Sequence, residues 1–301
     1  DIIRLSRETV PVVAFVLKTL IERGYVDREL RITEIGTKEI EGTLTQGVVD
    51  YGCPRCGGHG LDLELWSEVM ERFKKTVRER PEAIQEFDQG YVTPETSVGR
   101  LMLADARGDL KDRNIFLIGD DDLVSLAALI SGKPKSVTVL EIDSRLTDFI
   151  EKWAERLGGS IETITTDICE PLPPALLRRF HTFFTDPPET IEALRLFLGR
   201  GIASLSGEGC SGYFGLTTAE SSIGKRLELQ RFLCETGVVI TDIIPNFNHY
   251  ENWGYYASTP AYELAPSKKA PTSIWYMSDL YRIETVRGYR TDNSPVRGDI
   301  Y

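Results

Sequence analysis

The sequence predicts an α/β domain in which a largely parallel sheet carries helices on both faces. Two observations from residue 114 onward support this fold class. Short runs rich in Val, Ile, Phe and Thr alternate with helix-like stretches, and acidic residues directly follow the first four of these runs. Such alternation is typical of crossover units, and sheets built from crossover units bind ligands at the carboxyl ends of their strands.

The expected elements follow one another along the chain. Strands are predicted at residues 114–119, 136–143, 161–167, 180–185, 212–218, 238–244 and 272–277. Helices are predicted at residues 95–104, 124–130, 144–157 and 174–179. Residues 282–301 are polar and rich in turn-forming residues, so we expect them to cover the pocket or to hang free.

A separate N-terminal domain is predicted over residues 1–87, followed by the sheet domain over residues 88–301. Apolar residues between 12 and 21 form one face of a helix, and residues 31–38 resemble the start of a wing in a winged-helix domain. Winged-helix domains commonly bind DNA, but the first fifty residues include seven basic and nine acidic side chains and offer no basic face. We therefore expect this domain to act in dimerisation or as a lid.

A CxxC turn at residues 52–59 is typical of a zinc knuckle. Structural zinc takes four ligands, whereas Cys53, Cys56 and His59 supply three and no second CxxC follows. We therefore expect no bound metal, with Cys53 and Cys56 as the alternative metal site. The other cysteines lack a neighbouring base motif and are expected to be buried thiols: Cys169, Cys210 and Cys234.

The composition excludes several classes of protein. The chain has 46 acidic and 35 basic residues and a net charge of -11, which disfavours polyanions such as nucleic acids and favours cationic ligands. The apolar run at residues 10–17 is too short to cross a bilayer. Five cysteines without a disulfide pattern, and no signal-peptide pattern, predict a cytoplasmic location.

Acidic residues end four successive predicted strands. They lie in Gly119-Asp-Asp-Asp122, in Glu141-Ile-Asp143, at Asp167 and in Asp186-Pro-Pro-Glu189. Capping of the following helices explains one or two of these positions. Four acidic strand ends on one rim instead predict a pocket for hydroxyls, amines and positive charge.

This spacing resembles the nucleoside-binding sheet of class I methyltransferases. In that class an acid after the second strand binds ribose and an acid after the third binds adenine, which implies Glu141 and Asp167 for these contacts. The usual glycine-rich turn is absent, because Asp121 and Asp122 replace two glycines. Carboxylates there repel the carboxylate of S-adenosylmethionine and favour a cofactor that ends in a bare ammonium, as decarboxylated S-adenosylmethionine does.

The Asp-Pro-Pro turn at residues 186–188 is similar to one in amino-group methyltransferases. There the turn presents a carboxylate and a backbone carbonyl to a nitrogen nucleophile. A rigid diproline strand exit is the structural alternative. Because the turn shares a rim with the acids assigned to the nucleoside, we favour the functional interpretation.

Four motifs together resemble the branched-chain polyamine synthases of thermophilic archaea and bacteria, also called N4-bis(aminopropyl)spermidine synthases. The motifs are Gly119-Asp-Asp-Asp122, Leu140-Glu-Ile-Asp143, Thr185-Asp-Pro-Pro-Glu-Thr190 and Asp88-Gln-Gly-Tyr-Val-Thr-Pro94. The resemblance covers essentially the whole chain. It implies transfer of aminopropyl groups from decarboxylated S-adenosylmethionine, as a co-substrate, to the secondary amine of spermidine, with methylthioadenosine released and no permanently bound cofactor.

The resemblance also implies Asp120 as the catalytic carboxylate, which would orient the amine and accept its proton. Asp186 is the second catalytic candidate, and covalent transfer through a carboxylate is the rival mechanism. We expect substrate contacts from Asp122, Glu189, Glu220, Tyr91 and Tyr213, and cofactor contacts from Gly119, Asp121, Glu141, Asp167 and Gln89. Further aromatic residues of the rim loops could cover methylenes: Phe214, Trp253, Tyr255 and Tyr256. No role is assigned to His59, His181 or His249.

Two other functions remain open from the sequence. One is an amino-group methyltransferase that uses ordinary S-adenosylmethionine, and the other is a winged-helix regulator that senses a polyamine without chemistry. We expect small-molecule substrates, no nucleic acid, no membrane and a homodimer.

Overall fold

The computed structural model describes residues 2, 6, 8–41, 56, 59–251, 254–266, 268, 273–298 and 300. Its centre is a seven-stranded sheet with the order β3-β2-β1-β4-β5-β7-β6. The strands are β1 Asn114–Ile118, β2 Ser136–Glu141, β3 Glu162–Thr165, β4 Thr182–Thr185, β5 Ser211–Thr217, β6 Val238–His249 and β7 Met277–Thr285. The first five run parallel, and β7 is antiparallel to both β5 and β6. The predicted α/β class with a largely parallel sheet is confirmed.

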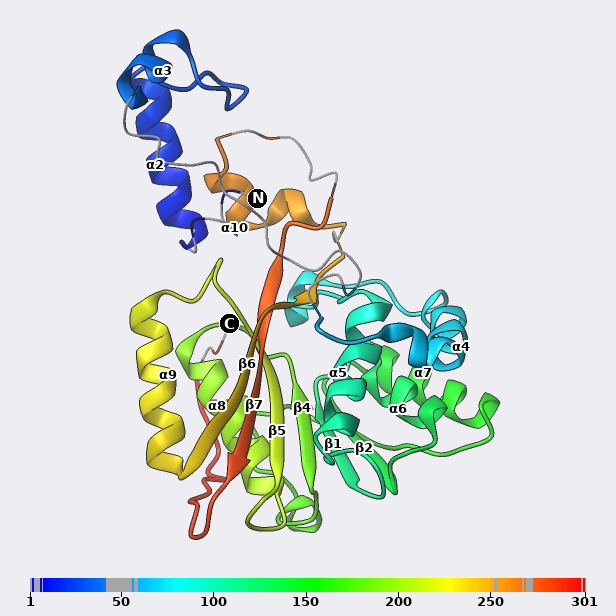
Figure 1. Ribbon diagram of the computed structural model, residues 1–301. Coiled ribbons are helices and arrows are strands. Elements are labelled where there is room, and N and C mark those ends of the chain that lie inside the picture. Colours follow the sequence, from blue (N-terminus) through cyan, green and yellow to red (C-terminus); the bar gives the residue numbers. More distant parts are fainter. Residues whose placement is uncertain are drawn as a thin grey trace.

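Helices cover both faces of this sheet (Figure 1). Alternate residues of β1 show why: Ile115 and Leu117 join one buried apolar cluster, while Phe116 and Ile118 join the other. The first cluster is completed by α4 Ser67–Val77, α5 Pro94–Ala106, α6 Val124–Ser131 and α7 Ser144–Arg156. The second is completed by α8 Ile191–Ser204 and α9 Ile223–Thr236. The remaining described elements are α2 Val10–Glu22, α3 Glu34–Ile40, α10 Pro260–Leu264, η1 Leu63–Trp66, η2 Gln85–Phe87, η3 Pro174–Leu176 and η4 Tyr256–Ser258.

Strand β7 corrects the prediction for the C-terminal region. The expected strand at 272–277 and the expected loose segment from 282 are both wrong, because β7 spans Met277–Thr285 and pairs with two neighbours. The sequence did not predict β7 at this position because the strand contains charged residues. One of them, Arg282, is buried because its guanidinium pairs with Asp109, Nε to Oδ2, at 2.8 Å. The segment after β7 packs on the domain, where Val296 N donates to Cys169 O at 3.0 Å.

Helices α2 and α3 stand apart from the sheet (Figure 1, blue). Helix α2 packs against α10, and Val10 N donates to Ala219 O at 2.9 Å. The predicted start of a wing at residues 31–38 is wrong, because α3 begins at Glu34 with Thr33 Oγ1 accepting from Gly36 N at 3.1 Å. Residues 42–55, which would hold the rest of the winged-helix prediction, lie outside the described residues.

Helix α4 precedes the predicted domain boundary at residue 87 and packs with the helices of the sheet domain. It contacts α5 and α6, and its Phe73 is fully buried in the first apolar cluster. The division of the chain into two domains stays a prediction. Among the helices described, none is long and apolar enough to cross a membrane.

Candidate active site

A cavity opens where the carboxyl ends of the parallel strands meet. Seven acidic residues line it, together with five aromatic ones: Asp88, Asp121, Glu141, Asp167, Asp186, Glu189, Glu220, Phe87, Phe197, Tyr250, Tyr255 and Tyr276. Neither lysine nor arginine is among its lining residues in the part of the chain that is described. The cavity is thus suited to a ligand with several positive charges.

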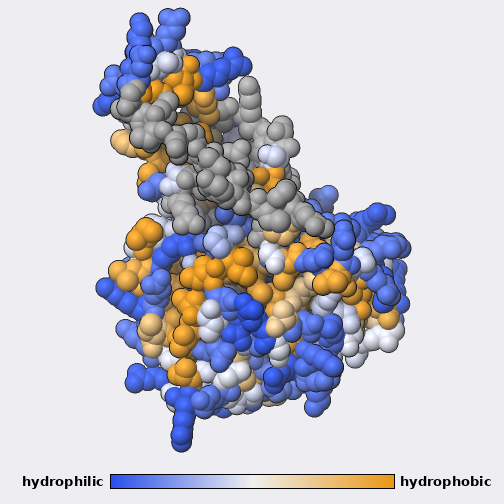
Figure 2. Space-filling model, in the orientation of Figure 1, coloured by the Kyte–Doolittle hydropathy of each residue, from blue (hydrophilic) through white to orange (hydrophobic). Residues whose placement is uncertain are grey.

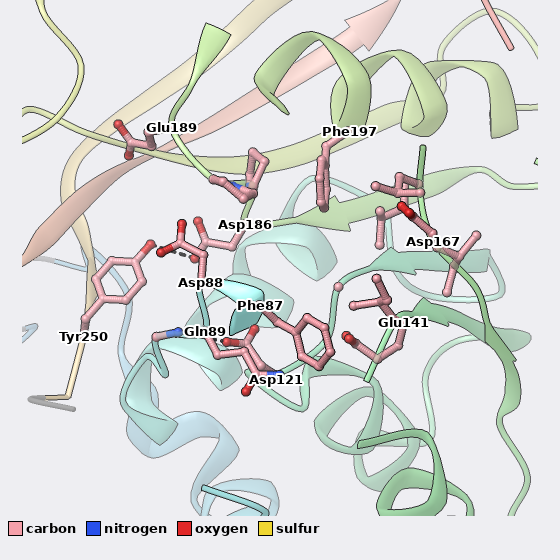
Figure 3. A pocket seen from close by; sticks show the side chains of 18 of the residues that line it. Phe87, Asp88, Gln89, Asp121, Glu141, Asp167, Asp186, Glu189, Phe197 and Tyr250 are labelled. Carbon is pink, nitrogen blue, oxygen red and sulfur yellow. Dashed lines mark hydrogen bonds between the residues drawn. The ribbon is translucent and has the colours of Figure 1, made fainter. Parts of the chain in front are cut away.

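The acids are spread along the cavity (Figure 3). Glu141 and Asp167 lie toward one end, and Glu189 lies at the other end. Asp88, Asp121 and Asp186 lie between them. The predicted meeting of acids from four strand ends is therefore what the structure shows.

The end that holds Glu141 has the features of a nucleoside site. Glu141 accepts from the backbone N–H of Asp120 at 2.8 Å and from that of Asp143 at 2.9 Å, so its carboxylate is held firmly. Each carboxylate oxygen retains a second acceptor site for a ribose hydroxyl. Asp167 is exposed to the cavity, and apolar side chains beside it offer flat surface to a base: Leu140, Ile142, Ile168 and Phe197.

The turn after β1 places the side chains of its three aspartates in different surroundings. Gly119 has φ +69°, which suits glycine and bends the chain sharply at the strand end. Asp121 lines the cavity and accepts from Gly90 N at 3.1 Å. Burial, followed by the charges of Asp122, Glu141 and Asp186, raises the pKa of Asp121 well above its usual range. A raised pKa makes this carboxylate a stronger base than an ordinary aspartate.

Asp120 does not line the cavity in this structure, and its predicted role as the catalytic carboxylate stays a prediction. It is 1% exposed, and its carboxylate accepts from Ser125 N at 3.2 Å in the first turn of α6. The resemblance placed the catalytic carboxylate at the first aspartate of the motif. The turn directs the second one, Asp121, into the cavity instead.

Three residues predicted to contact substrate lie elsewhere. Asp122 Oδ1 accepts from Val92 N, and Asp122 Oδ2 accepts from Arg100 Nη1, each at 2.7 Å. The hydroxyl of Tyr91 donates to the Pro81 carbonyl. Tyr213 is buried on β5, and its hydroxyl donates to Asp109. These side chains make contacts within the fold and do not line the cavity, so their contact with substrate stays a prediction.

Gln89 and Tyr255 support the cavity wall. Gln89 lines the cavity and donates from Nε2 to Asp143 Oδ2 at 2.9 Å. Tyr255 lines it too, and its hydroxyl donates to the Gln89 carbonyl. Phe214 is buried against Tyr281 and does not reach the cavity. Trp253 and the side chain of Tyr256 lie outside the described residues.

Asp186 is held at the centre of the cavity wall. Its Oδ2 accepts from Arg100 Nη2 and from the Tyr250 hydroxyl, each at 2.7 Å. Its Oδ1 lies over Gly215, where a Cβ atom would overlap it. Neither Arg100 nor Tyr250 was predicted from the sequence, because both approach from parts of the chain distant from residue 186.

The far end of the cavity holds a second acidic group. Glu189 accepts from Thr217 N and from the Ser221 hydroxyl, and burial followed by the charge of Glu220 raises its pKa well above the usual range. Glu220 accepts from the Tyr276 hydroxyl at 2.7 Å. Two carboxylates so close are suited to share an ammonium group.

The cysteines and histidines lie apart from this chemistry. Cys210 is buried as predicted, whereas Cys169 is half-buried and Cys234 is exposed, so the prediction of a buried thiol is wrong for Cys234. His59 donates its backbone N–H to Cys56 O at 2.9 Å. No group of three or more metal ligands occurs among the described residues, which do not include Cys53.

Asp88 gives the site a predicted dependence on pH. It lies at the solvent-accessible mouth, yet desolvation by the surrounding protein, with a contribution from Glu220, raises its pKa to about 6. A carboxylate with a raised pKa is protonated below that pH and charged above it, so Asp88 loses its attraction for an ammonium as the pH falls from 7 to 5. We expect the KM for a cationic substrate to rise about two- to fivefold over that range, the scale of one exposed ion pair.

The Asp88→Asn variant tests this dependence. It should show the raised KM already at pH 7 and a flatter profile down to pH 5, with Asp148→Asn on the exposed face of α7 as the control. An unchanged profile in Asp88→Asn would assign the pH dependence to another group.

The fold and the site define a class I methyltransferase-like domain with an acidic cavity at the carboxyl ends of its strands. A crystal structure from Pyrococcus horikoshii, provisionally assigned as an RNA methyltransferase, shares this fold at a TM-score of 0.50 and 16% identity, and the match covers 73% of this chain and 99% of that one. At that identity the likeness concerns the fold alone.

Comparison with known proteins identifies the family. A model described as the branched-chain polyamine synthase A C-terminal domain matches residues 68–300. The N(4)-bis(aminopropyl)spermidine synthase of Thermococcus kodakarensis is 49% identical over 95% of this chain and 83% of its own length. The same enzyme of Methanocaldococcus jannaschii is 46% identical over 96% and 84%. The chain belongs to the branched-chain polyamine synthase family, as the sequence resemblance predicted.

A relative of this chain has been crystallised with two ligands. The branched-chain polyamine synthase of Thermus thermophilus, crystallised with N4-aminopropylspermidine and 5′-methylthioadenosine, is 42% identical to this chain with a TM-score of 0.89. The match covers 99% of this chain and 85% of that one.

Proposed function

We propose that this protein transfers aminopropyl groups from decarboxylated S-adenosylmethionine to the secondary amine, N4, of spermidine. The products are N4-aminopropylspermidine, then N4-bis(aminopropyl)spermidine, and methylthioadenosine. The observation that supports this most is one cavity that joins the end at Glu141 and Asp167 to two acidic groups, with no basic residue among the described residues that line it. The ligands of the Thermus thermophilus relative agree with it.

The arrangement of acids suggests how the transfer proceeds. The adenosine lies at Glu141 and Asp167, which directs the aminopropyl chain on sulfur toward Asp121 and Asp186. The amine nitrogen forms a bond to the carbon next to sulfur, and the C–S electron pair returns to sulfur to leave a neutral thioether. Asp121 accepts the proton that the nitrogen loses and passes it to water, while Glu189 and Glu220 hold a distal ammonium. Holding both reactants in line lowers the entropic cost of this step.

The same acids select the co-substrate. Asp121 and Asp186 would face the amino-acid end of ordinary S-adenosylmethionine and repel its carboxylate. Decarboxylated S-adenosylmethionine presents an ammonium there instead. The site therefore favours aminopropyl transfer over methyl transfer.

Incubation with spermidine and decarboxylated S-adenosylmethionine tests the proposal. Mass spectrometry at elevated temperature should detect methylthioadenosine together with spermidine carrying one and then two added aminopropyl groups. Turnover with ordinary S-adenosylmethionine alone would instead assign methyl transfer. The absence of methylthioadenosine under all these conditions would rule out the proposed reaction.

We also propose that the enzyme works in the cytoplasm as a homodimer that does not bind nucleic acid. The net charge of -11 supports the last point, because a phosphate backbone would be repelled. Light scattering after size-exclusion chromatography measures the assembly. A monomer in that experiment, or DNA binding with a steep salt dependence, would contradict the respective statement.

A further inference from the structure

Arg100 is a buried cation behind the cavity wall. It is 4% exposed on α5 and does not line the cavity. Three nitrogens of its guanidinium each donate to a different segment: Nε to Asn248 Oδ1 at 2.8 Å, Nη1 to Asp122 Oδ2 at 2.7 Å and Nη2 to Asp186 Oδ2 at 2.7 Å. One side chain thus joins the turn after β1, the turn after β4 and strand β6.

These contacts belong to a closed ring of hydrogen bonds. From Arg100 the ring passes to Asn248, whose Nδ2 donates to Ser278 Oγ at 2.8 Å. Ser278 Oγ lies 3.1 Å from the Tyr250 hydroxyl, which donates to Asp186 Oδ2. Asp186 closes the ring with Arg100. Linked polar groups in a buried site stabilise one another and fix a single arrangement.

The charge of Arg100 is maintained inside the protein. Burial alone lowers the pKa of the guanidinium, but the carboxylates of Asp186 and Asp122 outweigh burial and raise it. The planar guanidinium also donates in fixed directions, which a lysine ammonium cannot reproduce. Arg100 therefore places a positive charge beside the Asp186 carboxylate and restrains its orientation.

Gly215 completes the restraint on Asp186. Asp186 Oδ1 occupies the space that a Cβ atom on residue 215 would need, and such an atom would also lie 2.9 Å from Ser278 Oγ and 3.2 Å from Asn248 Nδ2. One oxygen of the Asp186 carboxylate is therefore hydrogen-bonded to Arg100 and Tyr250, and the other lies against β5.

We propose that Arg100 is a positioning residue that fixes the orientation of the Asp186 carboxylate and thereby sets where the amine of the acceptor binds. This inference rests on the proposed function, because it assigns the acceptor to the Asp186 side of the cavity. A purely structural role for Arg100 would lower stability without changing how the folded enzyme binds its amine.

Two substitutions separate charge from geometry. Arg100→Gln removes both, so the KM for spermidine should rise at least tenfold. The acid limb of kcat/KM should move up by about one to three pH units, because Asp122 loses the cation that lowers its pKa. Arg100→Lys restores the charge alone, so it should return the acid limb toward the wild-type position while the KM stays raised. Affinity for methylthioadenosine should change less than threefold in both, because Glu141 and Asp167 are untouched. Equal KM and pH profiles in folded variants and wild type would overturn the proposal.

Gly215→Ala displaces Asp186 without altering Arg100. It should raise the KM for spermidine as Arg100→Gln does, whereas Gly199→Ala on α8, which meets no atom within 4 Å, should not. This variant decides the question if Arg100→Gln fails to fold, and an unchanged KM would then reject the proposal. If the wild type releases no methylthioadenosine, the proposed function fails, while calorimetric spermidine affinity of the same variants still supports or rejects the role of Arg100.

Discussion

Replacing Asp121 by Asn is expected to lower kcat by about 10²- to 10⁴-fold, the contribution typical of a general base. Asn has nearly the same shape as Asp and keeps an acceptor for Gly90 N–H, so the fold and the methylthioadenosine affinity should be preserved. It cannot accept a proton from the amine. Single-turnover kinetics with spermidine would separate this loss in the chemical step from weaker binding.

The neighbouring Asp120→Asn variant is the matched control. It makes the same chemical change one residue away, at a carboxylate that binds Ser125 N and does not line the cavity. It should keep most of the turnover of the wild type. The opposite pattern, with Asp120→Asn inactive and Asp121→Asn active, would return the base to the first aspartate of the motif.

The Asp122→Ala variant should fail in a different way, by losing about 3–5 kcal/mol of unfolding free energy, as breaking a buried ion pair commonly does. The change leaves the Arg100 guanidinium with one carboxylate fewer and the Val92 N–H without its acceptor. Urea denaturation followed by circular dichroism measures the effect. Asp148→Ala, on an exposed turn of α7, should change stability by less than about 0.5 kcal/mol. An equal denaturation midpoint in Asp122→Ala and wild type would show that the pair with Arg100 contributes little.

The acidic rim could be predicted because it depends on residues that are neighbours in the sequence. Asp and Glu follow runs of apolar β-branched residues, and parallel strands bring such endings to one edge of the sheet. The sequence could not say which of three adjacent aspartates enters the cavity. That choice depends on backbone angles after Gly119 and on contacts such as Gly90 N–H to Asp121, which span 31 positions.

The site residues that were not predicted are held by contacts between distant parts of the chain. Arg100 reaches Asn248 across 148 positions, and Tyr250 reaches Asp186 across 64. Single polar residues on helix α5 or beyond β6 have no local pattern that distinguishes them from surface residues. Strand β7 was misplaced for a similar reason, since Arg282 reads as solvent-facing until Asp109 is known to pair with it.

The place of β7 in the sheet has a consequence for synthesis of the chain. Strand β6 lies at the sheet edge with β7 as its neighbour, yet its residues leave the ribosome some thirty positions earlier. Until β7 emerges, the unpaired β6 segment, with Val239 and Ile243 exposed even in the finished fold, is open to pairing with other nascent chains. Ser278 lies in β7 and Tyr276 directly precedes it. A chain truncated before residue 276 would therefore be prone to aggregate as well as inactive.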